Sequence, residues 1–154
     1  MQVPVNKIAV LVGDGYQEMG FWYPLLRFRE EGVSVTVIAE AADQEYRGDL
    51  GYPVIADIAM SDARVSDYDA VILPGGAEND LTLGFVSEAQ RAGLVIGASA
   101  TAAKALSIAG TGRTAMDAVA EPVVTDGRLV TARSADDLPG YFLALTSALA
   151  TARA

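Results

Sequence analysis

The sequence predicts a single α/β domain with a doubly wound, mostly parallel sheet, helices on both faces and a β-hairpin near the C-terminus. Apolar runs at 7–12, 33–39, 68–73 and 94–97 alternate with helical segments, and continuous apolar runs are typical of parallel strands buried on both faces. An Asp126-Gly127 pair also separates two alternating segments within 121–132, which is the strongest short signal for a hairpin.

The helical segments are expected at 17–31, 85–92, 101–109 and 134–152. Pro24 lies inside the first of them and predicts a kink, or a helix start, near that position. Ser134 or Asp136 could cap the last helix. Residues 41–52 are polar and contain glycine, so we expect a loop there with at most a short β-excursion.

Composition excludes several kinds of function. The 154 residues fit one domain, and 20 acidic against 11 basic residues give a net charge of −9, which opposes binding to nucleic acid or to an anionic membrane. The chain has no cysteine and no histidine, so it lacks a thiol nucleophile and the commonest general base and metal ligand. We therefore expect no metal and no cofactor. A polar N-terminus and the lack of a membrane-length apolar run predict a cytoplasmic protein.

Ligands of doubly wound sheets bind beyond the carboxyl ends of the strands, and this rule selects the segments 13–18, 74–76, 97–101 and 114–117. Glu18 could act there as a general acid or base or bind a cation, with Asp14 beside it; a helix-start acid that favours the helix dipole is the alternative. Gly75 and Gly76 could offer backbone N–H groups to a ligand, or simply form a tight turn.

Gly97-Ala98-Ser99-Ala100-Thr101 is similar to a nucleophile elbow that has lost its last glycine. A nucleophilic Ser99 would need Lys104, Glu18 or Asp14 as its base, because no histidine exists. The alternative is a small residue that packs under, or caps, the following helix. Arg113 and Arg133 could bind an anion, although structural ion pairs are the favoured interpretation.

Four collinear motifs resemble the ThiJ/PfpI superfamily. They are K-I-A-V-L-V-G-D-G-Y-Q-E-M-G-F-W-Y-P-L-L-R-F-R-E-E-G-V-S-V at 7–35, D-Y-D-A-V-I-L-P-G-G at 67–76, A-G-T-G-R at 109–113 and V-V-T-D-G-R-L-V-T-A-R at 123–133. The resemblance implies a flavodoxin-like fold, of the class I glutamine amidotransferase type, over nearly the whole chain. It also implies a homodimer formed partly through the early helix around 21–28.

The family's catalytic centre is a cysteine on a strained strand-to-helix elbow, paired with an acid from the early helix. Alignment on the motifs places Ala100 at the nucleophile position and Thr101 at the histidine that follows it. Gly20 falls where the family carries its acid, with Glu18 two residues earlier. The resemblance therefore implies that thiol-dependent glyoxalase, deglycase and protease activities are absent. It also implies that Ala100 or Ser99 has a sparsely populated backbone conformation.

Two hypotheses about function follow. In the first, the protein binds or transforms a small metabolite, with Glu18 as acid or base and with Asp14, Gly20, Gly75, Gly76, Ala100 and Thr101 around the ligand. In the second, it is a catalytically inactive homologue that binds a ligand or assembles with a partner. An enzyme should bring polar groups together in the cleft, whereas an inert homologue can fill it with small apolar residues.

Overall fold

The computed structural model describes residues 7–108 and 121–153, and its centre is a seven-stranded sheet. The strand order is β5-β2-β1-β6-β7-β9-β8, and every neighbouring pair is parallel except β8 and β9. The strands are β1 (Lys7–Leu11), β2 (Ser34–Ala39), β5 (Ile58–Ala59), β6 (Ala70–Leu73), β7 (Val95–Ser99), β8 (Val123–Asp126) and β9 (Leu129–Ala132). The predicted α/β fold is confirmed.

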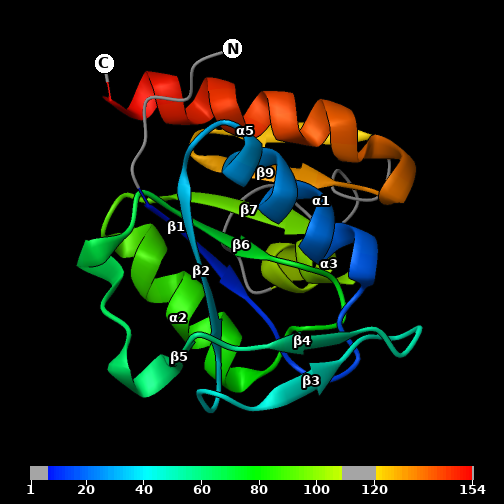
Figure 1. Cartoon of the computed structure of the whole chain (residues 1–154). Helices are drawn as coiled ribbons and strands as arrows, with labels where there is room; N and C mark the ends of the chain where they lie inside the picture. The colour runs from blue at the N-terminus through cyan, green and yellow to red at the C-terminus, as the bar shows by residue number, and fades with distance from the viewer. Residues whose placement is uncertain (1–6, 109–120, 154) are drawn as a thin grey trace.

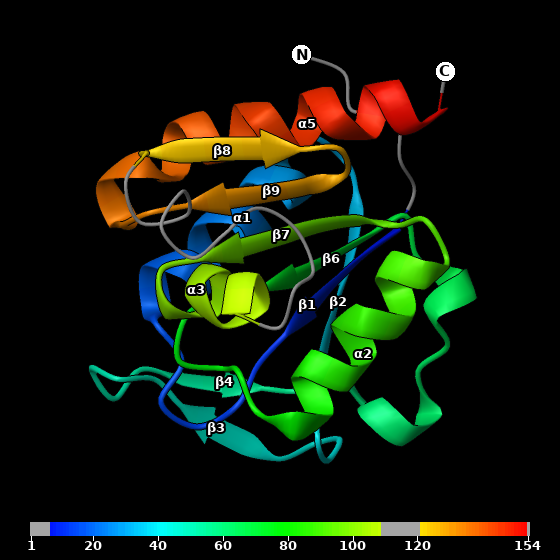
Figure 2. The ribbon, with the colours of Figure 1, turned by 180° about the vertical axis from the view of Figure 1, so that it is seen from behind.

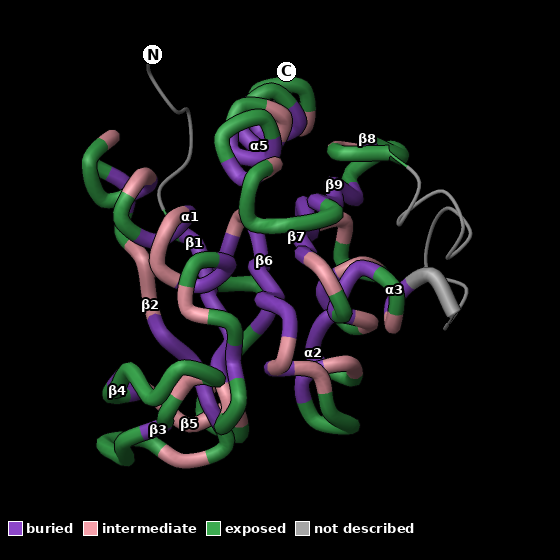
Figure 3. Tube along the Cα trace, turned by 90° about the vertical axis from the view of Figure 1, so that its right-hand side faces the viewer, coloured by how far each residue is buried: buried purple, intermediate pink, exposed green. Residues whose placement is uncertain are grey.

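Helices cover both faces of this sheet. They are α1 (Glu18–Glu30), α2 (Asp80–Arg91), α3 (Thr101–Ile108) and α5 (Leu138–Arg153), with short 3₁₀ turns η1 (Met60–Asp62), η2 (Val65–Asp67) and η3 (Ala135–Asp137). α1 and α5 lie on one face, and α2 and α3 on the other (Figures 1 and 2). Viewed along the edge in Figure 3, the central strands are buried between these layers. No helix among the described residues is long and apolar enough to cross a membrane.

One helix start agrees with the sequence prediction and one differs. α1 runs over Glu18–Glu30, within one residue of the predicted range at each end, and passes through Pro24, so the alternative of a start near Pro24 is wrong. Pro24 is buried in the core, and packing of this helix face offsets the single hydrogen bond that a proline cannot donate. α2 begins at Asp80, five residues before the predicted start. Asn79 caps it: the Thr82 N–H donates to Asn79 Oδ1 at 2.9 Å, and the Asn79 N–H donates to Thr82 Oγ1 at 2.8 Å.

The C-terminal hairpin is confirmed, but its turn lies one residue later than predicted. Asp126 pairs with Leu129 inside the ladder, so Gly127 and Arg128 form the loop. Gly127 has φ 63°, the positive value that the first loop residue of a type II′ turn requires. Ser134 does not start α5 directly, since the turn η3 intervenes between them; its N–H and hydroxyl both donate to Asp137 Oδ2.

A second, two-stranded antiparallel sheet occupies the segment that was expected to be mainly loop. β3 (Glu45–Arg47) pairs with β4 (Pro53–Ile55), and within residues 7–108 and 121–153 neither strand forms a ladder with the main sheet. The β-excursion was predicted, whereas its partner strand β4 was not. This hairpin lies near the start of α1, at the end of the molecule where the carboxyl end of β1 points (Figure 1).

Candidate functional site

The elbow between β7 and α3 has the strained backbone that the sequence predicted. Ala100, the single residue between the two elements, has φ 51°, a region that L-residues other than Asn and Asp seldom adopt. Its N–H donates to the Ala132 carbonyl at 2.8 Å, which ties the elbow to β9. The strained position therefore holds a methyl group, with no nucleophilic atom.

The Gly75-Gly76 turn after β6 faces this elbow, and both of its N–H groups are already hydrogen-bonded. The Gly75 N–H donates to Ser99 Oγ at 3.3 Å, and the Gly76 N–H donates to Thr101 Oγ1 at 3.1 Å. A Cβ on Gly75 would lie 3.0 Å from the Ser99 carbonyl oxygen and 2.8 Å from Gln17 Oε1, so a side chain at position 75 would crowd this approach. Two donors that could have served a ligand are thus used by hydroxyls of the elbow itself.

Ser99 is a packed residue between α1 and the glycine turn. Its side chain is buried, with only 3% of the residue exposed, and a Cβ built on Gly20 would lie 2.7 Å from its Oγ. Real Cβ atoms essentially never approach another heavy atom that closely. The side chain of Ser99 therefore takes the space that any side chain at position 20 would enter, including the acid that the family resemblance places there.

The two candidate carboxylates bind the β3–β4 hairpin. Glu18 Oε2 accepts hydrogen bonds from the N–H groups of Leu50 at 2.8 Å and Tyr52 at 3.2 Å, and Asp14 Oδ1 accepts one from Arg47 N–H at 3.0 Å. Each carboxylate thus accepts hydrogen bonds from the backbone of another segment, which stabilises the fold by holding that segment in place. It is added to the helix-start role of Glu18, which lies in the first turn of α1.

Tyr16 completes the attachment of the hairpin. Its buried hydroxyl donates to the Tyr52 carbonyl at 2.8 Å and accepts from Trp22 Nε1 at 3.2 Å. Burial, more than any other cause, raises the pKa of Tyr16, and the nearby Glu18 carboxylate acts in the same direction. The phenol therefore stays protonated and keeps donating at neutral pH.

A pocket of about 310 Å³ opens beside the elbow, and we call it the elbow pocket. Its lining residues are Gln17, Glu18, Met19, Asp49, Leu50, Ala100, Arg133, Ser134 and Ala135. Of the predicted site residues only Glu18 and Ala100 line it. The others, Asp14, Gly20, Gly75, Gly76, Ser99 and Thr101, pack behind it or hold the loops that frame it.

Sequence reasoning missed most of the lining. Gln17 and Met19 flank Glu18, so their position in the chain was a usable signal. Asp49 and Leu50 carried none, because they reach the pocket only through the folding of the hairpin. Arg133 lines the pocket and also lies 3.6 Å from the Asp137 carboxylate, a structural ion pair of the kind that was favoured.

Other candidate groups add little at this site. Lys104 is exposed on α3, while Arg113 and the segment 114–117 lie outside the described residues. Within the described part of the chain, no group of three or more histidine, cysteine, aspartate or glutamate side chains could hold a metal ion.

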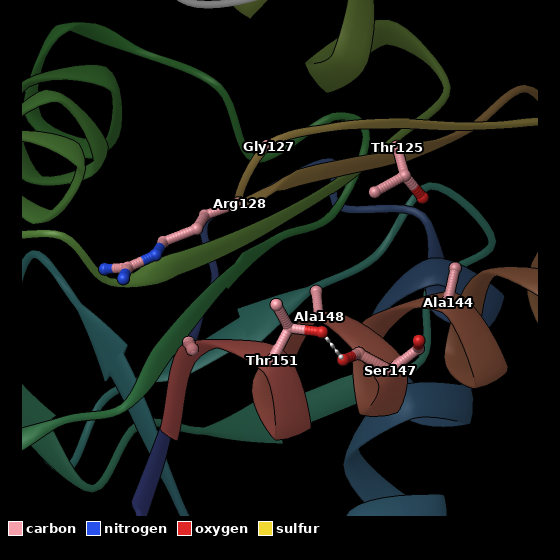
Figure 4. A pocket seen from close by; sticks show the side chains of 8 residues that line it. Thr125, Gly127, Arg128, Ala144, Ser147, Ala148 and Thr151 are labelled. Atoms are coloured by element: carbon pink, nitrogen blue, oxygen red, sulfur yellow. Dashed lines mark hydrogen bonds between the residues drawn. The ribbon is translucent and has the colours of Figure 1, made fainter. Parts of the chain in front are cut away.

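A hollow of about 330 Å³ lies between the β8–β9 turn and the C-terminal half of α5 (Figure 4). Its walls are small residues such as Ala144, Ser147 and Ala148, and the Thr151 hydroxyl already donates to the Ser147 carbonyl. The Arg128 side chain extends away from these hydroxyls and donates to the Gly93 carbonyl. The elbow pocket is the site at the carboxyl ends of the strands, where this type of fold binds ligands.

Similar solved structures share this architecture. A two-domain protein from Anabaena variabilis, with DJ-1/ThiJ/PfpI-like and ferritin-like domains, has a TM-score of 0.84 at 27% identity, covering 94% of this chain and 48% of that chain. A cysteine-to-alanine mutant of the DJ-1 superfamily protein STM1931 from Salmonella typhimurium has a TM-score of 0.81 at 27% identity, covering 95% and 91% of the two chains.

Sequence relatives agree with the structural ones. An uncharacterized protein of Archaeoglobus fulgidus is 27% identical over 88% of this chain and 93% of its own length. The putative cysteine protease YraA of Bacillus subtilis is 41% identical, but the match covers 49% of this chain and 45% of YraA. The profile of the DJ-1/PfpI family matches residues 6–148. This cysteine-free chain therefore belongs to the DJ-1/PfpI family.

Proposed function

We propose that this protein binds a small metabolite in the elbow pocket without turning it over, as a non-catalytic member of the family. The observation that carries the proposal is that the groups on which the catalytic hypothesis depends are absent or already hydrogen-bonded. Position 100 offers only a methyl group, the Gly75 and Gly76 N–H groups are bonded to hydroxyls, and the Glu18 carboxylate accepts two backbone N–H groups.

The elbow pocket supports binding of a small ligand with both polar and apolar parts. Its volume of about 310 Å³ falls at the lower end of the range for small-molecule sites. Met19, Leu50 and Ala135 supply apolar surface, whereas the side chains of Gln17 and Asp49 supply hydrogen-bonding groups. A small metabolite with one apolar end fits this lining.

A thermal-shift screen of metabolites tests the binding. A ligand at 100 times its Kd should stabilise the fold by about 2.7 kcal/mol, since it binds only the folded state. Ala135→Trp should fill the exposed mouth of the pocket and remove the shift, whereas Ala150→Trp, on the exposed face of α5, should keep it. A shift that survives Ala135→Trp would place the ligand elsewhere, and a library without any shift would favour the assembly role.

Assays for glyoxalase, deglycase and peptidase activity test the lack of turnover. None should be detected, because general acid-base assistance alone contributes roughly 10²–10⁴-fold and the thiol is missing as well. If a residual activity exists, the acid-base hypothesis predicts that Glu18→Gln abolishes it and that Ser99→Ala has less effect. Robust turnover of a glyoxal that Glu18→Gln leaves unchanged would contradict both readings of the site.

A homodimer through α1 is a second proposal, and the distribution of exposed apolar side chains favours it. Among the described residues, five of the seven large exposed hydrophobic side chains lie on α1 or the β3–β4 hairpin: Met19, Leu26, Leu50, Tyr52 and Ile55. Such a concentration is typical of an interaction surface. Sedimentation at micromolar concentration should give a dimer that Leu26→Glu dissociates and that Leu143→Glu, on α5, does not. A wild-type monomer would contradict the proposal.

A further inference from the structure

The turn between β3 and β4, residues 48–51, forms the outer wall of the elbow pocket. Asp49 and Leu50 line the pocket from this turn, and Leu50 is 86% exposed. The two strands that carry the turn pair only with each other among the described residues. The position of this wall therefore depends on contacts other than a sheet ladder.

Those contacts come from the segment that leads into α1. The Gly15 N–H donates to the Arg47 carbonyl, and the Asp49 N–H donates to the Tyr16 carbonyl, each at 2.8 Å. Glu18 is the group that holds the far side of the turn, because its Oε2 accepts from both Leu50 N–H and Tyr52 N–H.

Gly48 makes the approach of this carboxylate possible. A Cβ on Gly48 would overlap the carboxylate of Glu18 and would also lie 2.9 Å from the Tyr16 carbonyl oxygen. The backbone of the turn therefore packs directly on the Glu18 side chain. Hydrogen bonds to a charged acceptor are stronger than those between neutral groups. The two bonds to the Glu18 carboxylate should therefore stabilise the turn more than the backbone bonds of Gly15 and Asp49 do.

We propose that Glu18 is a positioning residue which holds turn 48–51 across the elbow pocket, and that Leu50 limits the size of the molecules that reach Ala100. The selection of a ligand by Leu50 rests on the proposed binding function, whereas the hold of Glu18 on the turn does not. An exposed turn with few apolar contacts belongs to the low-stability part of a fold and opens readily when such a hold is lost.

Because the chain has no cysteine, a single introduced cysteine can report access to the elbow pocket. Ala100→Cys places a single thiol in the elbow pocket, and its alkylation rate can be measured with iodoacetamide and with a bulky fluorescein maleimide. The ratio of the bulky to the small rate reports access, because a change in the pKa of the thiol alters both rates by way of the same thiolate.

In the Ala100→Cys background, Glu18→Ala should raise this ratio at least about tenfold, because it removes two hydrogen bonds to a charged acceptor and the loss of one such bond already shifts an opening equilibrium by about tenfold. Leu50→Ala should raise the ratio as well, because it shortens the side chain that limits access while the hydrogen bonds of the turn to Glu18 remain. Glu18→Gln keeps an acceptor oxygen and should give a smaller rise. Glu88→Ala removes the same charge from an exposed position of α2 and should leave the ratio unchanged.

Hydrogen exchange of the cysteine-free protein gives a second measurement that needs neither ligand nor thiol. Glu18→Ala should speed exchange of the Asp49 amide, which donates to the Tyr16 carbonyl and not to Glu18, about tenfold while α2 keeps its wild-type protection. Unchanged exchange at the Asp49 amide would overturn the positioning role, and an unchanged ratio in Leu50→Ala would overturn the size limit. Faster exchange combined with an empty metabolite screen would support the positioning role and contradict the proposed binding function.

Discussion

Replacement of Gly20 by alanine should destabilise the protein only while Ser99 keeps its hydroxyl. The added Cβ would lie 2.7 Å from Ser99 Oγ, so the hydroxyl must move. Ser99 Oγ accepts the buried Gly75 N–H at 3.3 Å, and this bond is lost when the hydroxyl moves away.

The magnitudes of the opposing effects can be estimated. A buried N–H group left without an acceptor costs about 1–3 kcal/mol. Alanine in place of glycine inside a helix raises the free energy of unfolding by about 0.5–1 kcal/mol. Gly20→Ala should therefore lower the free energy of unfolding by roughly 0–2.5 kcal/mol. Ser99→Ala breaks the same hydrogen bond directly, so in its background Gly20→Ala should be neutral or stabilising.

A double-mutant cycle measures this dependence. Urea denaturation of the four variants can be followed by the fluorescence of Trp22, the single tryptophan, which packs edge-on against Phe21 in α1. The coupling energy between positions 20 and 99 should be about 1–3 kcal/mol, since both single changes break the same hydrogen bond. Effects that add to within about 0.5 kcal/mol would refute the packing described for Ser99.

Three further predictions concern stability. Ala100→Gly should raise the free energy of unfolding by about 1 kcal/mol in the same urea assay, because glycine adopts a positive φ without strain; a loss of stability would contradict strain at the elbow. Asn79→Ala should lower it by about 1 kcal/mol by removing the cap of α2, and no change would mean that the cap contributes little. Burial raises the pKa of Tyr141, whose hydroxyl has no hydrogen-bond partner among the described residues. Above about pH 10 the Tyr141 phenol therefore ionises in the unfolded state but not in the folded state. The free energy of unfolding should then fall by about 1.4 kcal/mol per pH unit. Tyr141→Phe should reduce that alkaline slope by this amount and leave neutral-pH stability equal or higher; an unchanged slope would contradict the shift.

Local patterns in the sequence were sufficient for six of the seven strands of the main sheet, and the short edge strand β5 was not predicted. The apolar runs that became β1, β6 and β7 are buried almost throughout, as is the second half of β2, and burial on both faces requires a continuous run of apolar residues. The family resemblance implied a strained backbone at Ala100 or Ser99, and the φ of 51° places the strain at Ala100. The cap at Asn79 was also a local signal, although a neutral Asn-x-x-Thr pair is easier to overlook than one with an acid.

The candidate site needed the tertiary structure, because its contacts join residues that no short pattern connects. Glu18 lies 32 residues before Leu50, and its partners are backbone N–H groups that every loop possesses. The Ser99 hydroxyl was a possible nucleophile in the sequence, and only the approach of α1 and the Gly75 turn shows it packed and hydrogen-bonded. The sequence thus determined which chemistry is missing, since residue types alone exclude a thiol and an imidazole. Three-dimensional packing decided what the remaining polar groups do, since the direction of a hydrogen bond depends on neighbours that only folding brings together.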